Sequence, residues 1–169
     1  MTSDKYLKHR NLGAFVGRYG GIYEHSPWVA EETFEVSREI DDVDELARIF
    51  RKCVDLATNE RKLELIRAHP DLAGKAALRG ELTEESSTEQ ASAGIDQCSQ
   101  EEYQQFQELN DSYKQKFGFP FVMAVRGSNR HEILAAFGRR LENDSKTEFD
   151  TAINEIHKIA RLRLQELDT

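Results

Sequence analysis

Residues 66–72 read Ile-Arg-Ala-His-Pro-Asp-Leu and lie at the end of a helical pattern over residues 59–68. The residue before a proline is driven out of the helical region, so the helix is expected to stop at His69, beside Pro70. His69 then lies at a helix end on a stiff backbone. A lone histidine in this position more often caps helix carbonyls than performs catalysis, so it needs supporting residues elsewhere.

A second polar cluster occupies residues 86–94, which read Ser-Ser-Thr-Glu-Gln-Ala-Ser-Ala-Gly. Its first four residues fit the capping-box pattern, which by itself explains Glu89 as a partner of a backbone amide. Gln90 carries a neutral amide that donates and accepts, which suits a planar urea-like group. The polar stretch 74–87 is either a surface loop or a connection that brings His69 and Glu89 together.

The sequence is typical of an all-α protein. Apolar spacing and capping patterns predict further helices over residues 27–36, 43–57, 100–117, 133–141 and 149–167. The start signals are Ser26 with Pro27, Asp42 with Glu45, and Ser99 with Glu102. We therefore predict a single compact domain over residues 1–169 with roughly seven to nine helices.

One element is ambiguous. Residues 121–125, Phe-Val-Met-Ala-Val, fit a short buried strand as well as a helix. Pro120 and the flanking Gly118 and Gly127 favour an irregular segment with exposed backbone amides. The alternative is an ordinary piece of the hydrophobic core.

The last predicted helix places an arginine within an apolar face. At about 100° per residue, Arg163 projects from inside the apolar stripe, whereas Arg161 points away from it. Burying an unpaired charge costs several kcal/mol, so Arg163 must meet an anion. That anion is either a structural glutamate or a substrate carboxylate, and the residue pattern alone favours the structural salt bridge.

Composition excludes several classes of function. The net charge of -8 argues against nucleic acid or an anionic membrane as a partner. Cys53 and Cys98 fall in helical patterns without a C-x-x-C spacing, so we expect reduced thiols. The polar N-terminus and the lack of an apolar run of about 20 residues favour a cytoplasmic protein.

No metal or cofactor motif is present in the sequence. His131 and Glu132 begin an H-E-x-x-H pattern, but Ala135 occupies the position of the second histidine. Neither a glycine-rich phosphate loop nor a G-x-S-x-G elbow occurs. We therefore expect a function that needs neither a metal nor a cofactor.

Several blocks together resemble one enzyme family. Residues 68–74, 82–94 and 117–127 are similar to the OHCU (2-oxo-4-hydroxy-4-carboxy-5-ureidoimidazoline) decarboxylases of urate degradation. Residues 23–28 and 159–164 agree near the two ends. The blocks follow the family's order over nearly the whole chain, which makes the resemblance specific.

The resemblance implies a carboxy-lyase that converts the small molecule OHCU to (S)-allantoin, and a homodimer. The substrate carries its own electron sink, so no cofactor is implied. His69 would deliver a proton, Glu89 would orient His69 or grip the substrate hydroxyl, and Arg163 would anchor an anionic or carbonyl oxygen. The implied substrate contacts are Pro70, Ser86, Ser87, Thr88, Gln90, Phe121, Val122, Met123, Ala124 and Val125, the last five through their backbone.

Two other hypotheses remain open. A non-catalytic member of the family would keep the scaffold as a helical ligand-binding or interaction domain, but His69, Glu89 and Arg163 are all present. A neighbouring activity, such as hydrolysis of the preceding intermediate, would require different motifs.

Overall fold

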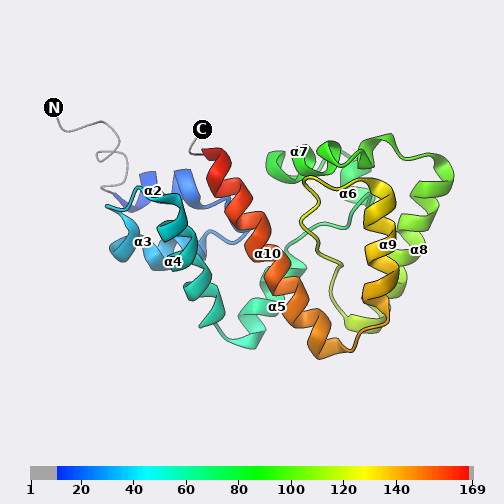
Figure 1. The fold of residues 1–169 in the computed structure, drawn as a ribbon. Coiled ribbons are helices and arrows are strands. Elements are labelled where there is room, and N and C mark those ends of the chain that lie inside the picture. The colour runs from blue at the N-terminus through cyan, green and yellow to red at the C-terminus, as the bar shows by residue number, and fades with distance from the viewer. Residues whose placement is uncertain (1–10, 168–169) are drawn as a thin grey trace. The chain divides into compact units, whose positions relative to one another are not determined.

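The computed structural model describes residues 11–167. Over this range the chain forms nine α-helices and one short 3₁₀ helix, with no strand (Figure 1). The predicted all-α fold is confirmed, and the number of α-helices lies within the predicted range. The elements are α2 (Leu12–Tyr19), α3 (Trp28–Ser37), α4 (Val43–Asp55), α5 (Asn59–Arg67), α6 (Lys75–Leu78), α7 (Glu84–Ser92), η1 (Ile95–Gln97), α8 (Gln100–Phe117), α9 (Arg130–Leu141) and α10 (Ser145–Leu167).

The chain divides into two compact units. The first unit contains the described residues up to Ala68 and those from His157 onward, and the second unit runs from His69 to Ile156. Helix α10 therefore contributes residues to both units. The assignment of residues 1–169 to one domain stays a prediction.

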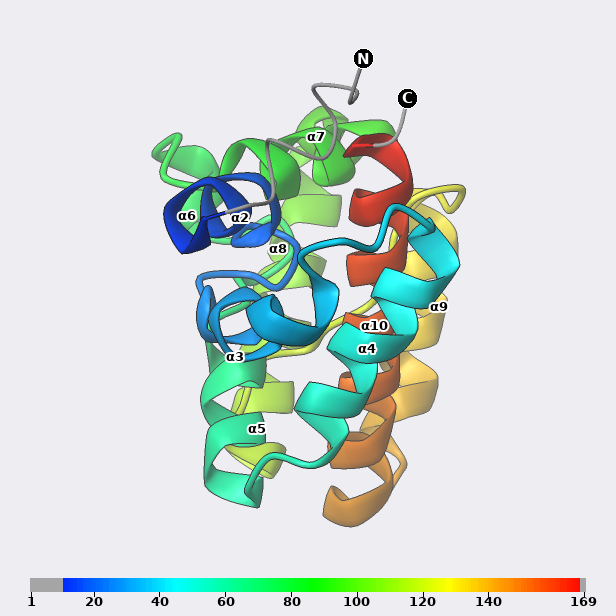
Figure 2. The ribbon, with the colours of Figure 1, turned by 90° about the vertical axis from the view of Figure 1, so that its left-hand side faces the viewer.

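The core of the first unit is a cluster of aromatic rings. The ring of Phe15 lies 4.9 Å from that of Tyr19 and 5.4 Å from that of Phe34 between centroids. Phe50 of α4 completes the cluster at 5.9 Å from Tyr19. These rings join α2 to both α3 and α4. Helices α3 and α4 also contact each other directly, and the three helices lie together in the first unit (Figure 2).

The core of the second unit forms between α8 and α9, which run side by side (Figure 1). Phe121 stacks on Phe137 of α9, with centroids 3.8 Å apart and planes at 12°. The edge of Tyr113 from α8 meets Phe121 at 5.4 Å. The irregular segment after α8 is thereby packed into the core at Phe121.

Two predicted helix starts are confirmed. The carboxylate of Asp42 accepts the amide of Glu45 at 2.8 Å, and α4 begins at the next residue after Asp42. Ser99 and Glu102 form a complete capping box at the start of α8. These caps satisfy amides that the first helical turn leaves without a partner.

Two other capping predictions are wrong. The Ser26 hydroxyl donates to the carbonyl of Glu24 instead of capping α3, which begins at Trp28. The capping box over residues 86–89 does not form, because Thr83 caps α7 by accepting the amide of Ser86 at 3.2 Å. Glu89 therefore lies inside a helix, and capping no longer explains its presence.

The remaining corrections concern the connections. The polar stretch 74–87 contains α6 and the start of α7, so it is not one loop. Cys98 lies between η1 and α8, outside any helix, whereas Cys53 lies in α4 as predicted. Both are free thiols, in agreement with the prediction.

Candidate active site

His69 is the first residue of the second unit and is only 7% exposed. The preceding helix ends as predicted, because the amide of Ala68 donates back to the carbonyl of Glu64 at 2.9 Å and Pro70 follows two residues later. The loop that follows His69 is held in place by hydrogen bonds from two other helices.

The loop after His69 is held by side chains of α8. Asn110 donates to the carbonyl of Leu72 at 2.9 Å, and Gln107 donates to the carbonyl of Ala73 at 2.6 Å. Ala73 has φ of 52°, a left-handed conformation that is strained for a residue with a side chain. The side-chain amides of α8 therefore stabilise a turn that the loop sequence does not favour by itself.

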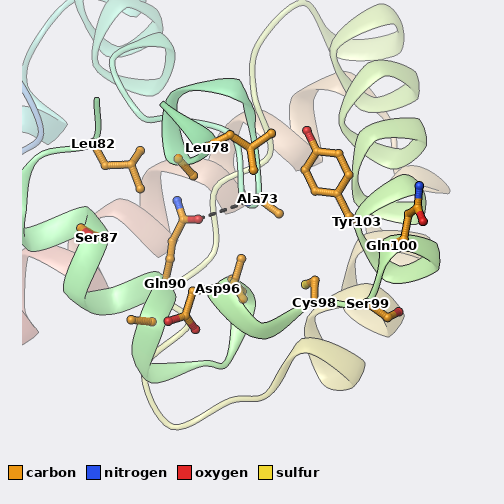
Figure 3. Close-up of a pocket in the computed structure, with 13 residues that line it drawn as sticks. Ala73, Leu78, Leu82, Ser87, Gln90, Asp96, Cys98, Ser99, Gln100 and Tyr103 are labelled. Carbon is orange, nitrogen blue, oxygen red and sulfur yellow. Dashed lines mark hydrogen bonds between the residues drawn. The ribbon is translucent and has the colours of Figure 1, made fainter. Parts of the chain in front are cut away.

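Helix α7 also binds this loop, through Gln90. The side-chain oxygen of Gln90 accepts the amide of Ala73 at 3.1 Å (Figure 3), and its nitrogen donates to the carbonyl of Asp71 at 3.3 Å. An amide side chain can make four hydrogen bonds, and these contacts account for two of them. The connection after the loop thus folds back and brings α7 against the residues that follow His69.

Gly74 is required by this close approach. A Cβ at this position would lie 2.7 Å from the Cβ of Asp71. Asp71 itself forms an ion pair with Lys114 of α8, with 2.6 Å between Oδ2 and Nζ. The turn thus leaves no room for a side chain at Gly74.

The predicted residues of α7 differ in exposure. Ser86 is buried and Glu89 half-buried, and with about 100° per residue they lie roughly 60° apart around the helix. Ser87 and Thr88 are exposed, and the hydroxyl of Thr88 donates to the carbonyl of Glu84 at 2.9 Å. The structure thus places Ser86 and Glu89 on one side of α7, and substrate contacts by Ser87 and Thr88 stay predictions.

A cavity of about 520 Å³ lies beside α7 (Figure 3). Ser87 and Gln90 are the predicted site residues among those that line it, whereas Ser86 and Glu89 are not. Apolar atoms from α6, η1 and the start of α8 form much of the wall, including Leu78, Ile95 and Tyr103. The cavity therefore borders the α7 face that carries Gln90, away from Glu89.

Cys98 also lines this cavity. Burial raises the pKa of its thiol above the ordinary value, and the nearby Glu102 carboxylate adds to the shift. A nucleophilic cysteine needs a lowered pKa, so Cys98 has the character of a structural thiol.

The segment between α8 and α9 is irregular, as predicted. Phe121, Val122 and Val125 are buried, whereas Met123 and Ala124 are half-buried. The amide of Ala124 donates to a carboxylate oxygen of Glu155 at 3.3 Å. The backbone of this segment is thus bonded by side chains rather than by a regular helix or sheet.

Arg163 belongs to the first unit and is 4% exposed, so its predicted burial is confirmed. Its Nη2 donates to the carboxylate of Glu24 at 2.7 Å, and its Nη1 donates to the carbonyl of Gly21 at 3.2 Å. Arg161 is exposed and pairs with Asp44. The structural glutamate that sequence analysis considered is therefore Glu24.

Sequence analysis did not single out Glu24. It is 1% exposed, and a carboxylate is rarely buried to this degree without a charged partner. It lies in the block of residues 23–28 that resembles the family, but its partner is 139 residues away. Only the apolar residues directly before it, Ile22 and Tyr23, hinted at its burial.

A second chain of polar groups in the first unit runs from the buried Tyr23 and His157 to the exposed Asp55. The Tyr23 hydroxyl lies 2.8 Å from Nδ1 of His157, and Nε2 of His157 lies 2.9 Å from the carboxylate of Asp55. Burial lowers the pKa of His157, although Asp55 opposes this shift. A neutral ring that donates from Nε2 and accepts at Nδ1 satisfies both contacts.

The part of the chain that the structure describes contains neither a cluster suited to a metal ion nor a membrane-spanning helix. Across residues 11–167 there is no cluster of three or more His, Cys, Asp and Glu side chains suited to binding a metal ion. The helices in that range are too short or too polar to span a bilayer.

Comparison with known proteins gives a consistent result. The sequence model of the OHCU decarboxylase family matches residues 10–165. The 2-oxo-4-hydroxy-4-carboxy-5-ureidoimidazoline decarboxylase of Haloferax volcanii is 49% identical over 153 residues, which cover 90% of this chain and 88% of the relative.

Two solved structures are also similar. An (S)-allantoin synthase has a TM-score of 0.75 and 31% identity, and the match covers 97% of this chain and 52% of that chain, so this chain spans about half its length. An OHCU decarboxylase crystallised in the presence of (S)-allantoin has a TM-score of 0.69 and 26% identity, covering 89% of this chain and 96% of the other. The family match over nearly the whole described structure and the high identity lead to one conclusion: the chain belongs to the OHCU decarboxylase family.

Proposed function

We propose that this chain decarboxylates OHCU to (S)-allantoin in urate degradation. The observation that carries the proposal is the family match over residues 10–165, which includes His69, Glu89 and Arg163. The Haloferax relative is named for this activity, and a similar structure was solved with (S)-allantoin. Burial of both His69 and Arg163 also supports the proposal, because protonation and charge stabilisation are most effective away from water.

The chemistry requires orientation and one stereospecific proton. The bond from the ring to the carboxylate breaks, carbon dioxide leaves, and the electron pair passes into the adjacent ring C=N bond. The ring nitrogen that receives the electron pair takes up a proton. A proton then adds to the ring carbon that bears the ureido group while the neighbouring hydroxyl loses its proton and becomes the carbonyl of allantoin, and only one face of the ureido carbon meets the donor. An imidazole titrates near neutral pH, so His69 is suited to deliver this proton.

The other predicted residues would position the substrate. Glu89 would orient the His69 ring or accept a hydrogen bond from the substrate hydroxyl. It lies inside α7, which Thr83 caps, so Glu89 does not cap this helix. Arg163 would bind an anionic or carbonyl oxygen through its planar guanidinium. Its bond to Glu24 would keep the guanidinium in a fixed orientation, which is the arrangement needed for efficient catalysis.

Further contacts would complete the site. Ser86 and Gln90 would bind the ring and ureido groups, with Pro70 shaping the wall next to His69. Gln90 has hydrogen-bonding capacity beyond its two loop contacts. The neighbouring Ser87 and Thr88 and the backbone of residues 121–125 would contribute as the family resemblance implies.

The test is the formation of optically active allantoin. Urate, urate oxidase and hydroxyisourate hydrolase would generate OHCU in the cuvette, and circular dichroism would follow (S)-allantoin. The parent protein should give a rapid signal, and His69→Ala should give slow, racemic product. His131→Ala is the matched control, since the His131 side chain is 74% exposed on α9. A parent signal no larger than the blank would refute the proposal and favour a non-catalytic binding domain.

We also propose a cytoplasmic homodimer in which residues 1–169 act as one domain. The family resemblance supports the dimer, and the family match that runs through both units supports the single domain. Size-exclusion chromatography with light scattering would measure the mass. A mass of about 19.4 kDa, that of one chain, at micromolar concentration would rule out a stable dimer.

A further inference from the structure

The carbonyl of Val122 accepts a hydrogen bond from a half-buried arginine outside the predicted site. Nη1 of Arg140, on α9, donates to this carbonyl at 2.6 Å. The Arg140 guanidinium carbon also lies 4.2 Å from the ring centroid of Phe121. Arg140 therefore contacts both residues at the start of the segment that is expected to bind substrate.

Arg140 is itself held by a buried carboxylate. Its Nε donates to Glu148 at 2.7 Å, and the Glu148 side chain is fully buried. Glu148 also accepts the hydroxyl of Tyr113 at 2.6 Å and the amide of Asn143 at 2.9 Å. Three donors on one buried carboxylate leave Arg140 with little freedom to reorient.

The geometry of a peptide bond carries the effect to the next residue. The Val122–Met123 peptide is trans and planar, so the N–H of Met123 points opposite to the carbonyl of Val122. With that carbonyl fixed on Arg140, the Met123 N–H is directed to the other side of the segment. Among the residues that the structure describes, the Met123 amide has no acceptor.

Amides without an acceptor are uncommon in folded proteins, where more than nine in ten buried backbone groups have a hydrogen-bond partner. Met123 is half-buried and lies between the buried Val122 and Ala124, whose amide is bonded to Glu155. We propose that Arg140, fixed by Glu148, is a positioning residue that aims the Met123 N–H at an oxygen of the substrate. This inference rests on the proposed decarboxylase function and extends it to a residue pair that touches no substrate atom.

Two variants separate positioning from stability. Arg140→Lys keeps the charge but cannot bond Glu148 and the Val122 carbonyl in the same planar geometry. Arg139→Lys makes the same change at the neighbouring residue of α9, whose side chain is exposed. We expect Arg140→Lys to lower kcat/KM by about 10- to 100-fold and to reduce the optical purity of allantoin, with Arg139→Lys at the parent values. Both are measured well below their unfolding temperatures.

Nuclear magnetic resonance gives a direct readout on the parent enzyme. The sequence contains two methionines, Met1 and Met123, so ¹⁵N-methionine labelling gives a simple spectrum in which the Met123 amide can be followed. Titration with (S)-allantoin should shift this resonance and slow its exchange with solvent. The shift should shrink in Arg140→Lys and persist in Arg139→Lys.

The outcomes are distinct. If the parent protein is active but its Met123 resonance does not shift on addition of (S)-allantoin, the inference is overturned, even if Arg140→Lys does not fold. The inference is also overturned if Arg140→Lys folds and has the same kcat/KM as the parent protein. Failure of the proposed function appears separately, as a parent enzyme without turnover of OHCU.

Discussion

Replacing Gln90 with leucine tests whether α7 holds the loop that follows His69. The change keeps the size of the side chain and removes both of its bonds to the loop. Ala73 is 5% exposed, so its amide would lose its acceptor in the interior, at a cost of about 1–3 kcal/mol. Loss of the bond to the half-buried Asp71 adds about 0.5–1.5 kcal/mol. The expected sum of about 1.5–4.5 kcal/mol corresponds to a fall of roughly 3–18 °C in Tm for a chain of this size.

Urea unfolding followed by far-ultraviolet circular dichroism would measure the loss. Gln104→Leu is the matched control, because Gln104 is exposed on α8 and its amide donates to the neighbouring Glu108 at 3.4 Å rather than to another segment of the described chain. The control should stay within about 0.5 kcal/mol of the parent. If Gln90→Leu were no less stable than the control, Gln90 would not be holding the loop and this reasoning would be wrong.

Two further predictions concern titratable groups in the first unit. Burial lowers the pKa of His157, so on acidification the unfolded chain protonates this histidine at a higher pH than the folded chain does. The contribution of His157 to the free energy of unfolding is therefore complete above about pH 6.5 and falls as the pH drops below that value. Urea unfolding between pH 8 and 5 should show a steeper loss for the parent than for His157→Gln, and equal slopes would contradict the assignment. Burial, with a contribution from Glu32, raises the pKa of Cys53 to about 11, so iodoacetamide at pH 8 should alkylate it roughly 100-fold more slowly in the folded protein than in urea. Peptide mass spectrometry would resolve the rate, and similar rates in both states would exclude this burial effect.

Local rules predicted the helices with strong start signals. Asp42 and the pair Ser99 with Glu102 cap as expected, because the side chains involved are three residues apart and need no distant partner. Pro70 and Gly118 also marked the ends of α5 and α8 correctly. Such features depend on neighbouring residues alone, so the sequence contains all the information needed.

The same rules failed where two local solutions compete. Residues 83–89 contain four hydroxyl side chains that can cap a helix, Thr83, Ser86, Ser87 and Thr88. The observed start at Thr83 places Glu84 and Glu85 in the first turn, where the positive end of the helix dipole favours them. A start at Ser86 would forgo that gain. The four-residue helix α6 is also below the length at which apolar spacing is informative.

The contacts that hold the candidate site were beyond prediction because they join distant residues. Gln107 and Asn110 bind the loop after His69 across more than 30 positions of sequence, and nothing in α8 distinguishes them from its other amides. The left-handed conformation of Ala73 has no signature either, since alanine rarely adopts it. The position of Arg140 near the end of α9 is equally typical of a solvent-facing cation. Its partner Glu148 lies in the first turn of α10.

Arg163 shows how far sequence reasoning extends and what the structure adds. Its place in an apolar stripe required burial and an anion, and both are observed, with Glu24 as the anion. The two explanations considered for that anion do not exclude each other, because a guanidinium carries five N–H donors and can bond more than one acceptor. Glu24 and Arg163 form an ion pair without net charge, which would weaken the pull of the arginine on a substrate anion and at the same time fix its direction. For a reaction in which carbon dioxide must leave, a well-oriented arginine in such a pair is the more useful one, since a guanidinium without a counter-charge would stabilise the carboxylate of the bound substrate.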